Sequence, residues 1–158
     1  MKHAVSISLG SPKRDKRVEV TLFGEKVIIE RIGTDGELEA AANLYKEMDG
    51  KVDAFGVGGT DLGLLVDGKF YPLYSIQPMV RHVKHTPIVD GSGLKNTLES
   101  RALPALVEYL GERLGPKRGF VVSGGERWGL SKSFADHGFE IVFGDLMFAL
   151  GYPSPLNP

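Results

Sequence analysis

The stretch at residues 120–145 reads FVVSGGERWGLSKSFADHGFEIVFGD and carries the clearest fold signal in the chain. A short apolar run ends in a glycine turn, helical spacing follows over residues 130–137, and a second apolar run at 139–143 ends in an acid. Strand, helix and strand in this order predict a βαβ crossover, in which the two strands run parallel. The stretch therefore predicts an α/β domain.

The same layout is typical of a dinucleotide-binding turn. In such a turn glycines allow a tight bend, the helix N-terminus holds the pyrophosphate, and an acid meets the ribose hydroxyls. Gly124 and Gly129 have the spacing of the first and last glycines of G-x-G-x-x-G, and Asp145 lies about 20 residues further on. Glu126 occupies the slot of the middle glycine, where it adds bulk and negative charge beside an anion. The residues that would bind NAD or NADP are Ser123, Gly124, Gly125, Arg127, Gly129 and Asp145.

These residues also have structural interpretations. The turn glycines can serve only to let the crossover pack tightly, with no ligand involved. Asp145 is also well placed to be the N-cap of a helix that begins at Leu146, because Asp is favoured at that position. In the nucleotide interpretation, Arg127 would meet a 2′-phosphate. The sequence leaves both interpretations open.

Hairpins dominate the first half of the chain, and strands alternate with helices in the second. Alternating apolar residues predict strands at 4–9, 17–23, 26–32, 52–56, 62–66, 69–74 and 87–89, and helical spacing predicts helices at 34–48, 75–84, 94–113 and 146–150. Thr34 with Glu37 predicts a capping box, Gly24-Glu25 a type II′ turn and Asp67-Gly68 a hairpin. Pro104 predicts that the longest helix is kinked or split in two.

Together these elements predict an α/β, Rossmann-like three-layer domain with a mixed, mostly parallel sheet and β-hairpin additions. The domain is expected to span residues 1–151, with the strand that ends at Ser123 in the centre of the sheet. Residues 152–158 hold three prolines, which predict an irregular tail.

Composition narrows the classes of function. The chain has 158 residues and no cysteine, which removes disulfides, thiolate metal sites and a cysteine nucleophile. Its formal net charge is −1, whereas a nucleic-acid-binding protein usually carries a basic excess. No apolar run approaches the ~20 residues of a membrane span, and no signal peptide is recognisable. We therefore expect a cytoplasmic protein that binds neither nucleic acid nor membrane. His82 and His85 have no third ligand beside them in the sequence, so no metal is expected.

Two further glycine-rich loops follow predicted strands. In residues 90–97, Asp90 and Lys95 flank a Gly-Ser-Gly turn, and a lysine beside a carboxylate can transfer a proton to or from an alcohol. In the alternative, Ser92 is an N-cap and Lys95 is a solvated surface residue. The other loop is 56–61. Because ligands in open α/β sheets collect at the carboxyl ends of the strands, we expect a pocket lined by loops 56–61, 90–95 and 123–129.

Several segments together resemble a bacterial family labelled quinate 5-dehydrogenase. They are Ser6–Ser11, Arg31–Gly36, Gly56–Gly59, Val89–Lys95, Arg127–Leu130 and Phe143–Gly151. The resemblance spans essentially the whole chain. It implies an NAD(P)-dependent oxidation of quinate at a ring hydroxyl, with Lys95 and Asp90 as the proton-transfer pair. Members of that family continue well past residue 158, so the resemblance also implies that this chain is an N-terminal part.

Two functions from different classes follow from the sequence. The first is an oxidoreductase, or a fragment of one, that acts on a small-molecule substrate of the quinate or shikimate type. The second is a non-catalytic α/β module that binds a small anionic ligand or another protein chain. The apolar run 146–150 holds few charges to face water, so we expect it to be buried by the domain's own core or by a second copy of the chain. The expected partner is a second copy in a homo-oligomer or a missing C-terminal domain.

Overall fold

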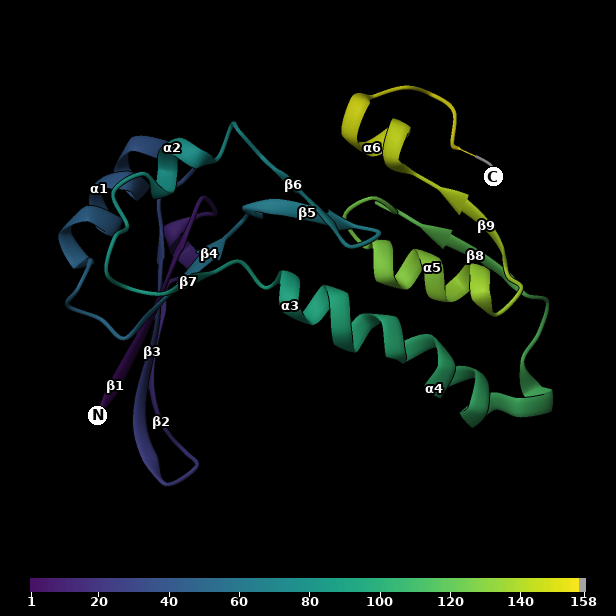
Figure 1. The fold of residues 1–158 in the computed structure, drawn as a ribbon, viewed down its shortest axis with the longest axis horizontal. Coiled ribbons are helices and arrows are strands. Elements are labelled where there is room, and N and C mark those ends of the chain that lie inside the picture. The colour runs from purple at the N-terminus through teal and green to yellow at the C-terminus, as the bar shows by residue number, and fades with distance from the viewer. Residues whose placement is uncertain (157–158) are drawn as a thin grey trace. The chain divides into compact units, whose positions relative to one another are not determined.

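The computed structural model describes residues 1–156 and divides into two compact units (Figure 1). Unit 1 comprises Met1–Gly63 and Pro72–Gly91, and unit 2 comprises Leu64–Tyr71 and Ser92–Pro158. The sequence predicts one domain over residues 1–151 and does not indicate this division. None of the helices in the described part of the chain has the length and apolar character that crossing a bilayer requires.

Unit 1 is built on a five-stranded mixed sheet with the order β2-β3-β1-β4-β7. Its strands are β1 (Lys2–Ser8), β2 (Lys16–Leu22), β3 (Glu25–Gly33), β4 (Ala54–Gly58) and β7 (Ile88–Val89). Both β3 and β4 pair in parallel with β1, β7 pairs in parallel with β4, and only β2 is antiparallel. The expected mixed α/β character is thereby confirmed. The expected centre is wrong, because β1 lies at the centre of this sheet and the strand before Ser123 belongs to unit 2.

The core of unit 1 lies on one face of this sheet. Two helices, α1 (Leu38–Met48) and α2 (Gln77–Val80), share a buried cluster with the strands, formed by Val5, Ile7, Ala41, Tyr45, Phe55, Val57 and Met79. Tyr45 is fully buried, and its hydroxyl donates to the carbonyl oxygens of Gly56 (3.0 Å) and Ile7 (3.3 Å). Because a buried hydroxyl needs a partner, these bonds allow a tyrosine at the centre of the core.

Local turn chemistry agrees with the sequence in one hairpin and differs in the other. In the hairpin of β5 (Gly63–Val66) and β6 (Lys69–Pro72), Asp67 and Gly68 have φ of 48° and 76°. Positive φ at both positions is typical of a type I′ turn, which the Asp-Gly pair favours. Between β2 and β3 the loop is Phe23-Gly24, with φ of 50° and 81°. The expected type II′ turn at Gly24-Glu25 is therefore wrong by one residue and in type.

The capping box expected at Thr34 is also wrong. Helix α1 begins later, with Glu37 as its N-cap and no side-chain hydrogen bond to that cap. Thr34 instead donates its hydroxyl to the carbonyl oxygen of Ser8, and its backbone N–H bonds the same oxygen. The threonine therefore extends the strand pairing of β1 and β3 rather than capping the helix.

Unit 2 contains the predicted crossover. Strand β8 (Arg118–Val121), helix α5 (Trp128–Asp136) and strand β9 (Glu140–Phe143) follow one another, and β8 pairs in parallel with β9. Helix α6 (Asp145–Leu150) follows β9 directly. The tail is not wholly irregular, since Leu156 and Phe143 exchange two backbone hydrogen bonds of 2.9 Å in an antiparallel bridge.

The long helical stretch of unit 2 is interrupted before its proline. It consists of α3 (Ser92–Leu94), a π-helical segment (Lys95–Glu99) and α4 (Ser100–Leu110). Pro104 lies inside α4, where it lacks the N–H that would bond the carbonyl of Ser100. The π-helical segment thus lies on the N-terminal side of Pro104. On that side the missing hydrogen bond and the proline ring displace the preceding turn of the helix.

Candidate functional site

The candidate site of unit 2 is the turn at residues 122–127, which joins β8 to α5. Because β8 and β9 are parallel, their carboxyl ends lie at the same edge, and the residues after β9 come beside this turn. The carboxylate of Asp145 accepts hydrogen bonds from the backbone N–H of Gly124 (2.7 Å) and of Gly125 (2.9 Å). The sequence placed these residues together correctly.

The structure contradicts one of the two sequence interpretations of Asp145. The N-cap of α6 is Gly144, and Asp145 is the first helical residue, so the N-cap interpretation is wrong. Its carboxylate binds two successive amides of the glycine turn, which is how a bound anion would be held there. The Asp145 carboxylate therefore takes the place that a bound anion would have at these two amides.

Close packing surrounds Gly124 of the turn and Gly129 at the start of α5. A Cβ on Gly124 would lie 2.5 Å from Cδ1 of Phe143 and 3.2 Å from the hydroxyl oxygen of Ser131. A Cβ on Gly129 would lie 3.2 Å from Cβ of Ser100, on the helix that packs against α5. Packing thus requires glycine at position 124, whereas a Cβ at position 129 would need Ser100 to shift by a few tenths of an ångström.

Two ion pairs tie the turn to the π-helical segment. Glu126 pairs with Lys95, and Arg127 pairs with Glu99. The partners lie four residues apart on the π segment, so both reach the start of α5 together. Lys95 is only 18% exposed in its side chain, so its interpretation as a solvated surface residue is wrong. Oxygen Oε2 of Glu99 is buried and has no hydrogen-bond partner among the described residues.

Asp145 lines two hollows. The first, of about 210 Å³, is lined by Trp128, Phe143, Leu156, Gly124, Gly125, Ser131 and Asp145. The second, of about 280 Å³, is lined by Val122, Ser123, Glu126, Asp145, Phe148 and Ala149. The first has mostly apolar walls, and its one charged group is Asp145. The hydroxyl of Ser131 there already donates to the carbonyl oxygen of Gly124 (3.1 Å).

The other predicted site residues fall partly in unit 1. Asp90 follows β7, and its Oδ2 accepts from the backbone N–H of Leu62 (2.7 Å), which ties the loops after β4 and β7 together at one sheet edge. Lys95 belongs to unit 2. The proton-transfer pair and the pocket shared by three loops therefore draw on both units and stay predictions.

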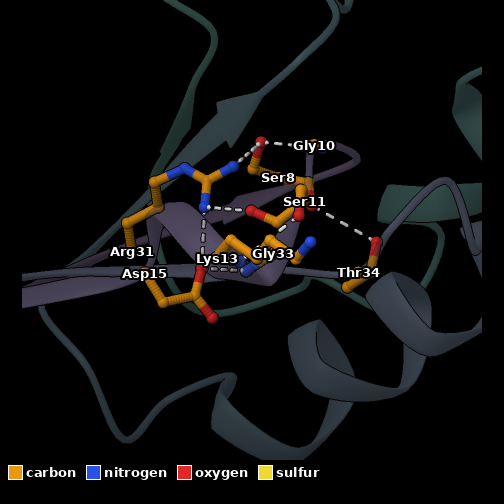
Figure 2. A network of polar contacts seen from close by, with 8 residues as sticks. All are labelled: Ser8, Gly10, Ser11, Lys13, Asp15, Arg31, Gly33 and Thr34. Atoms are coloured by element: carbon orange, nitrogen blue, oxygen red, sulfur yellow. Dashed lines mark hydrogen bonds and ion pairs between the residues drawn. The ribbon is translucent and has the colours of Figure 1, made fainter.

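A polar network that the sequence analysis missed lies at the carboxyl ends of β1 and β3 (Figure 2). The guanidinium of Arg31 donates to the side chain of Asp15 (2.7 Å), the carbonyl oxygen of Ser11 (3.1 Å) and the hydroxyl of Ser8 (3.0 Å). Asp15 also accepts from the backbone N–H of Gly33 (2.7 Å). Arg31 lies on β3, which is neither of the two strands that this loop joins, so no local sequence signal marked the network. The bonds fix that loop against β3.

A second carboxylate of unit 1 binds backbone amides. Asp49 accepts from the backbone N–H groups of Lys84 (2.9 Å), His85 (3.0 Å) and Thr86 (2.8 Å). Desolvation raises the pKa of this carboxyl, but the hydrogen bonds outweigh it and lower the pKa to about 2. Asp49 thereby anchors the basic segment that precedes β7.

Two family matches divide the chain between residues 90 and 93, just before the segment Ser92–Pro158 of unit 2, whereas Leu64–Tyr71 of that unit lies inside the first match. Residues 3–90, more than half of the chain, match a family described as a domain of unknown function, DUF8753. The chain belongs to the DUF8753 family. Residues 93–158 match a second domain of unknown function, DUF8754. The DUF8753 match ends at the last strand of unit 1, and the DUF8754 match begins in α3. No curated protein and no solved structure matches the chain.

Proposed function

We propose that the chain is a non-catalytic α/β binding module, with a small-ligand site beside Asp145 at the carboxyl ends of β8 and β9. The observation that carries this proposal is the pair of hydrogen bonds from Gly124 and Gly125 to Asp145. A pyrophosphate bound in the usual way would need those same N–H groups. Because they are already satisfied by a carboxylate, the turn favours a ligand other than a dinucleotide.

Two charged residues expected in the dehydrogenase site, one for the cofactor and one for proton transfer, form ion pairs with other side chains of unit 2. Arg127, which would meet a 2′-phosphate, pairs with Glu99, and Lys95 pairs with Glu126. Two carboxylates, those of Glu126 and Asp145, line the hollow beside Ser123, so a pyrophosphate there would meet negative charge. These contacts support the binding module over the quinate-type dehydrogenase, and we derive no hydride-transfer step.

The Rossmann-like arrangement is part of the same proposal. A parallel β8–α5–β9 crossover in unit 2 and the parallel pairing of β3, β1, β4 and β7 in unit 1 support it. In such folds ligands bind outside the carboxyl ends of the strands, which is where the hollows beside Asp145 lie. A ligand site at this edge agrees with that rule even when the ligand is not a nucleotide.

Ligand-dependent thermal stability tests the proposal. A ligand at 100 times its Kd stabilises the folded protein by about 2.7 kcal/mol. We expect no stabilisation by NAD, NADP, quinate or shikimate. Stabilisation by NAD or NADP, together with shifts of the Gly124 and Gly125 amide resonances, would overturn the proposal and favour the oxidoreductase. As a control, Glu126→Gly restores the glycine pattern of the motif, and it should still bind no dinucleotide while Asp145 holds the amides.

A further inference from the structure

We infer that the first hollow beside Asp145 binds a small organic cation, a primary ammonium group carried on a compact apolar body. The inference rests on the proposed function of unit 2 as a ligand-binding module, and it names the class of ligand. It combines the apolar walls of the hollow with the charge and the unused acceptor capacity of Asp145.

The walls of the hollow suit an apolar body. Trp128, Phe143 and Leu156 line it, together with the backbone of Gly124 and Gly125, around a volume of about 210 Å³. Small-molecule sites usually combine such walls with a few polar groups that fix the orientation of the ligand. The antiparallel bridge between Leu156 and Phe143 holds the leucine in this wall.

Asp145 requires that the polar end of the ligand be a hydrogen-bond donor. An ionised carboxylate only accepts, and its two oxygens offer about four lone-pair sites. The amides of Gly124 and Gly125 use one site on each oxygen, which leaves acceptor capacity on both. An ammonium group with three N–H donors can use that capacity and also neutralise the charge.

The neighbouring charges disfavour an anion at the same position. The nearest cations of the turn, Lys95 and Arg127, are held by Glu126 and Glu99. Together with Asp145 these five groups carry one net negative charge. The hydroxyl of Ser131 already donates to a carbonyl oxygen, so it offers an anion no free proton. Trp128 also lines the hollow, and indole is the aromatic side chain that attracts cations most strongly.

Titrations followed by amide NMR on the full chain test the inference with benzylamine, benzyl alcohol and benzoate, which share an aromatic body and differ in charge. We expect benzylamine to shift the Gly124 and Gly125 amides and the Trp128 indole N–H in a saturable way. Benzyl alcohol should bind at least tenfold more weakly, and benzoate should leave these signals unchanged. Equal or tighter binding of benzoate or benzyl alcohol would overturn the inference.

Variants separate the charge of Asp145 from its structural bonds. Asp145→Asn keeps one acceptor oxygen for the amides and removes the charge, so benzylamine should lose at least tenfold in affinity. Asp136→Asn is the matched control, because Asp136 is an exposed acid on α5 that pairs with Lys132. The Asp136→Asn variant should bind benzylamine with the same affinity as the wild type. If Asp145→Asn does not fold, Leu156→Ala alters only the apolar wall and should weaken benzylamine and benzyl alcohol alike.

The same titrations separate failure of the inference from failure of the proposed function. Saturable shifts at Gly124 and Gly125 with NAD but not with benzylamine would overturn both. If neither compound shifts these amides, the cation inference is overturned and the case against a dinucleotide stands. Benzylamine binding that is unchanged in a folded Asp145→Asn variant would also overturn the inference, because the charge would then contribute nothing.

Discussion

Replacing Gly124 with alanine tests whether this glycine is required by packing or by the approach of a ligand. The added Cβ would lie 2.5 Å from Cδ1 and 2.9 Å from Cε1 of Phe143, closer than two carbon atoms approach without displacement. The Phe143 ring would have to move toward the hollow that it lines, and overpacking of this kind costs about 1–3 kcal/mol. We expect Gly124→Ala to destabilise unit 2 by that amount.

Urea unfolding followed by tryptophan fluorescence measures this loss, because Trp128 is the only tryptophan and belongs to unit 2. The matched control is Gly115→Ala in the same unit, where the added Cβ meets none of the described atoms within 4 Å. That variant should be unchanged or stabilised by up to about 1 kcal/mol through its unfolded chain. A Gly124→Ala variant as stable as the wild type would refute the packing argument and leave ligand approach as the reason for the glycine.

Three further predictions concern a carboxylate, a buried tyrosine and an ion pair. The pKa of Asp49 is lowered to about 2, so its contribution to stability is complete above its unfolded pKa of about 4 and is lost as the pH falls through 2. The melting temperatures of Asp49→Asn and the wild type should therefore converge between about pH 4 and pH 2. Tyr45→Phe removes the bonds to Gly56 and Ile7 and should cost about 1 kcal/mol, measured by hydrogen exchange of the β1 and β4 amides. A double-mutant cycle of Lys95→Ala and Glu126→Ala should give a coupling of only about 0.5–1 kcal/mol, because the Glu126 side chain is 36% exposed.

The sequence predicted correctly those elements that depend on residues close together in the chain. The crossover of unit 2 follows from apolar runs and turn residues within 26 positions, and the structure has β8, α5 and β9 there. The Asp67-Gly68 hairpin likewise depends only on two residues that tolerate positive φ. Phe23 shows the limit of such reasoning, because a bulky residue at φ 50° is disfavoured and is tolerated only where strand pairing imposes it.

Features that depend on distant partners were not predictable in the same way. The apolar character of the β8 residues does not say which strands lie beside it, so its expected central position was wrong. The ion pairs of Glu126 and Arg127 join residues about 30 positions apart in sequence through a π-helical segment that no motif announces. The network of Arg31 was missed for the same reason, since its partners lie on a loop that only the sheet brings near.

The two acids of the glycine turn explain its departure from the dinucleotide pattern. The middle glycine of G-x-G-x-x-G exists so that a phosphate can approach the backbone from solution. Here the anion is Asp145, which reaches the amides of Gly124 and Gly125 from within the chain, so no approach from solution has to be kept clear. The middle position can then carry Glu126, whose carboxylate turns to Lys95 and helps to hold the π-helical segment against α5. The glutamate in the motif and the acid after β9 are therefore two parts of one arrangement, in which a turn of this shape is stabilised without a nucleotide.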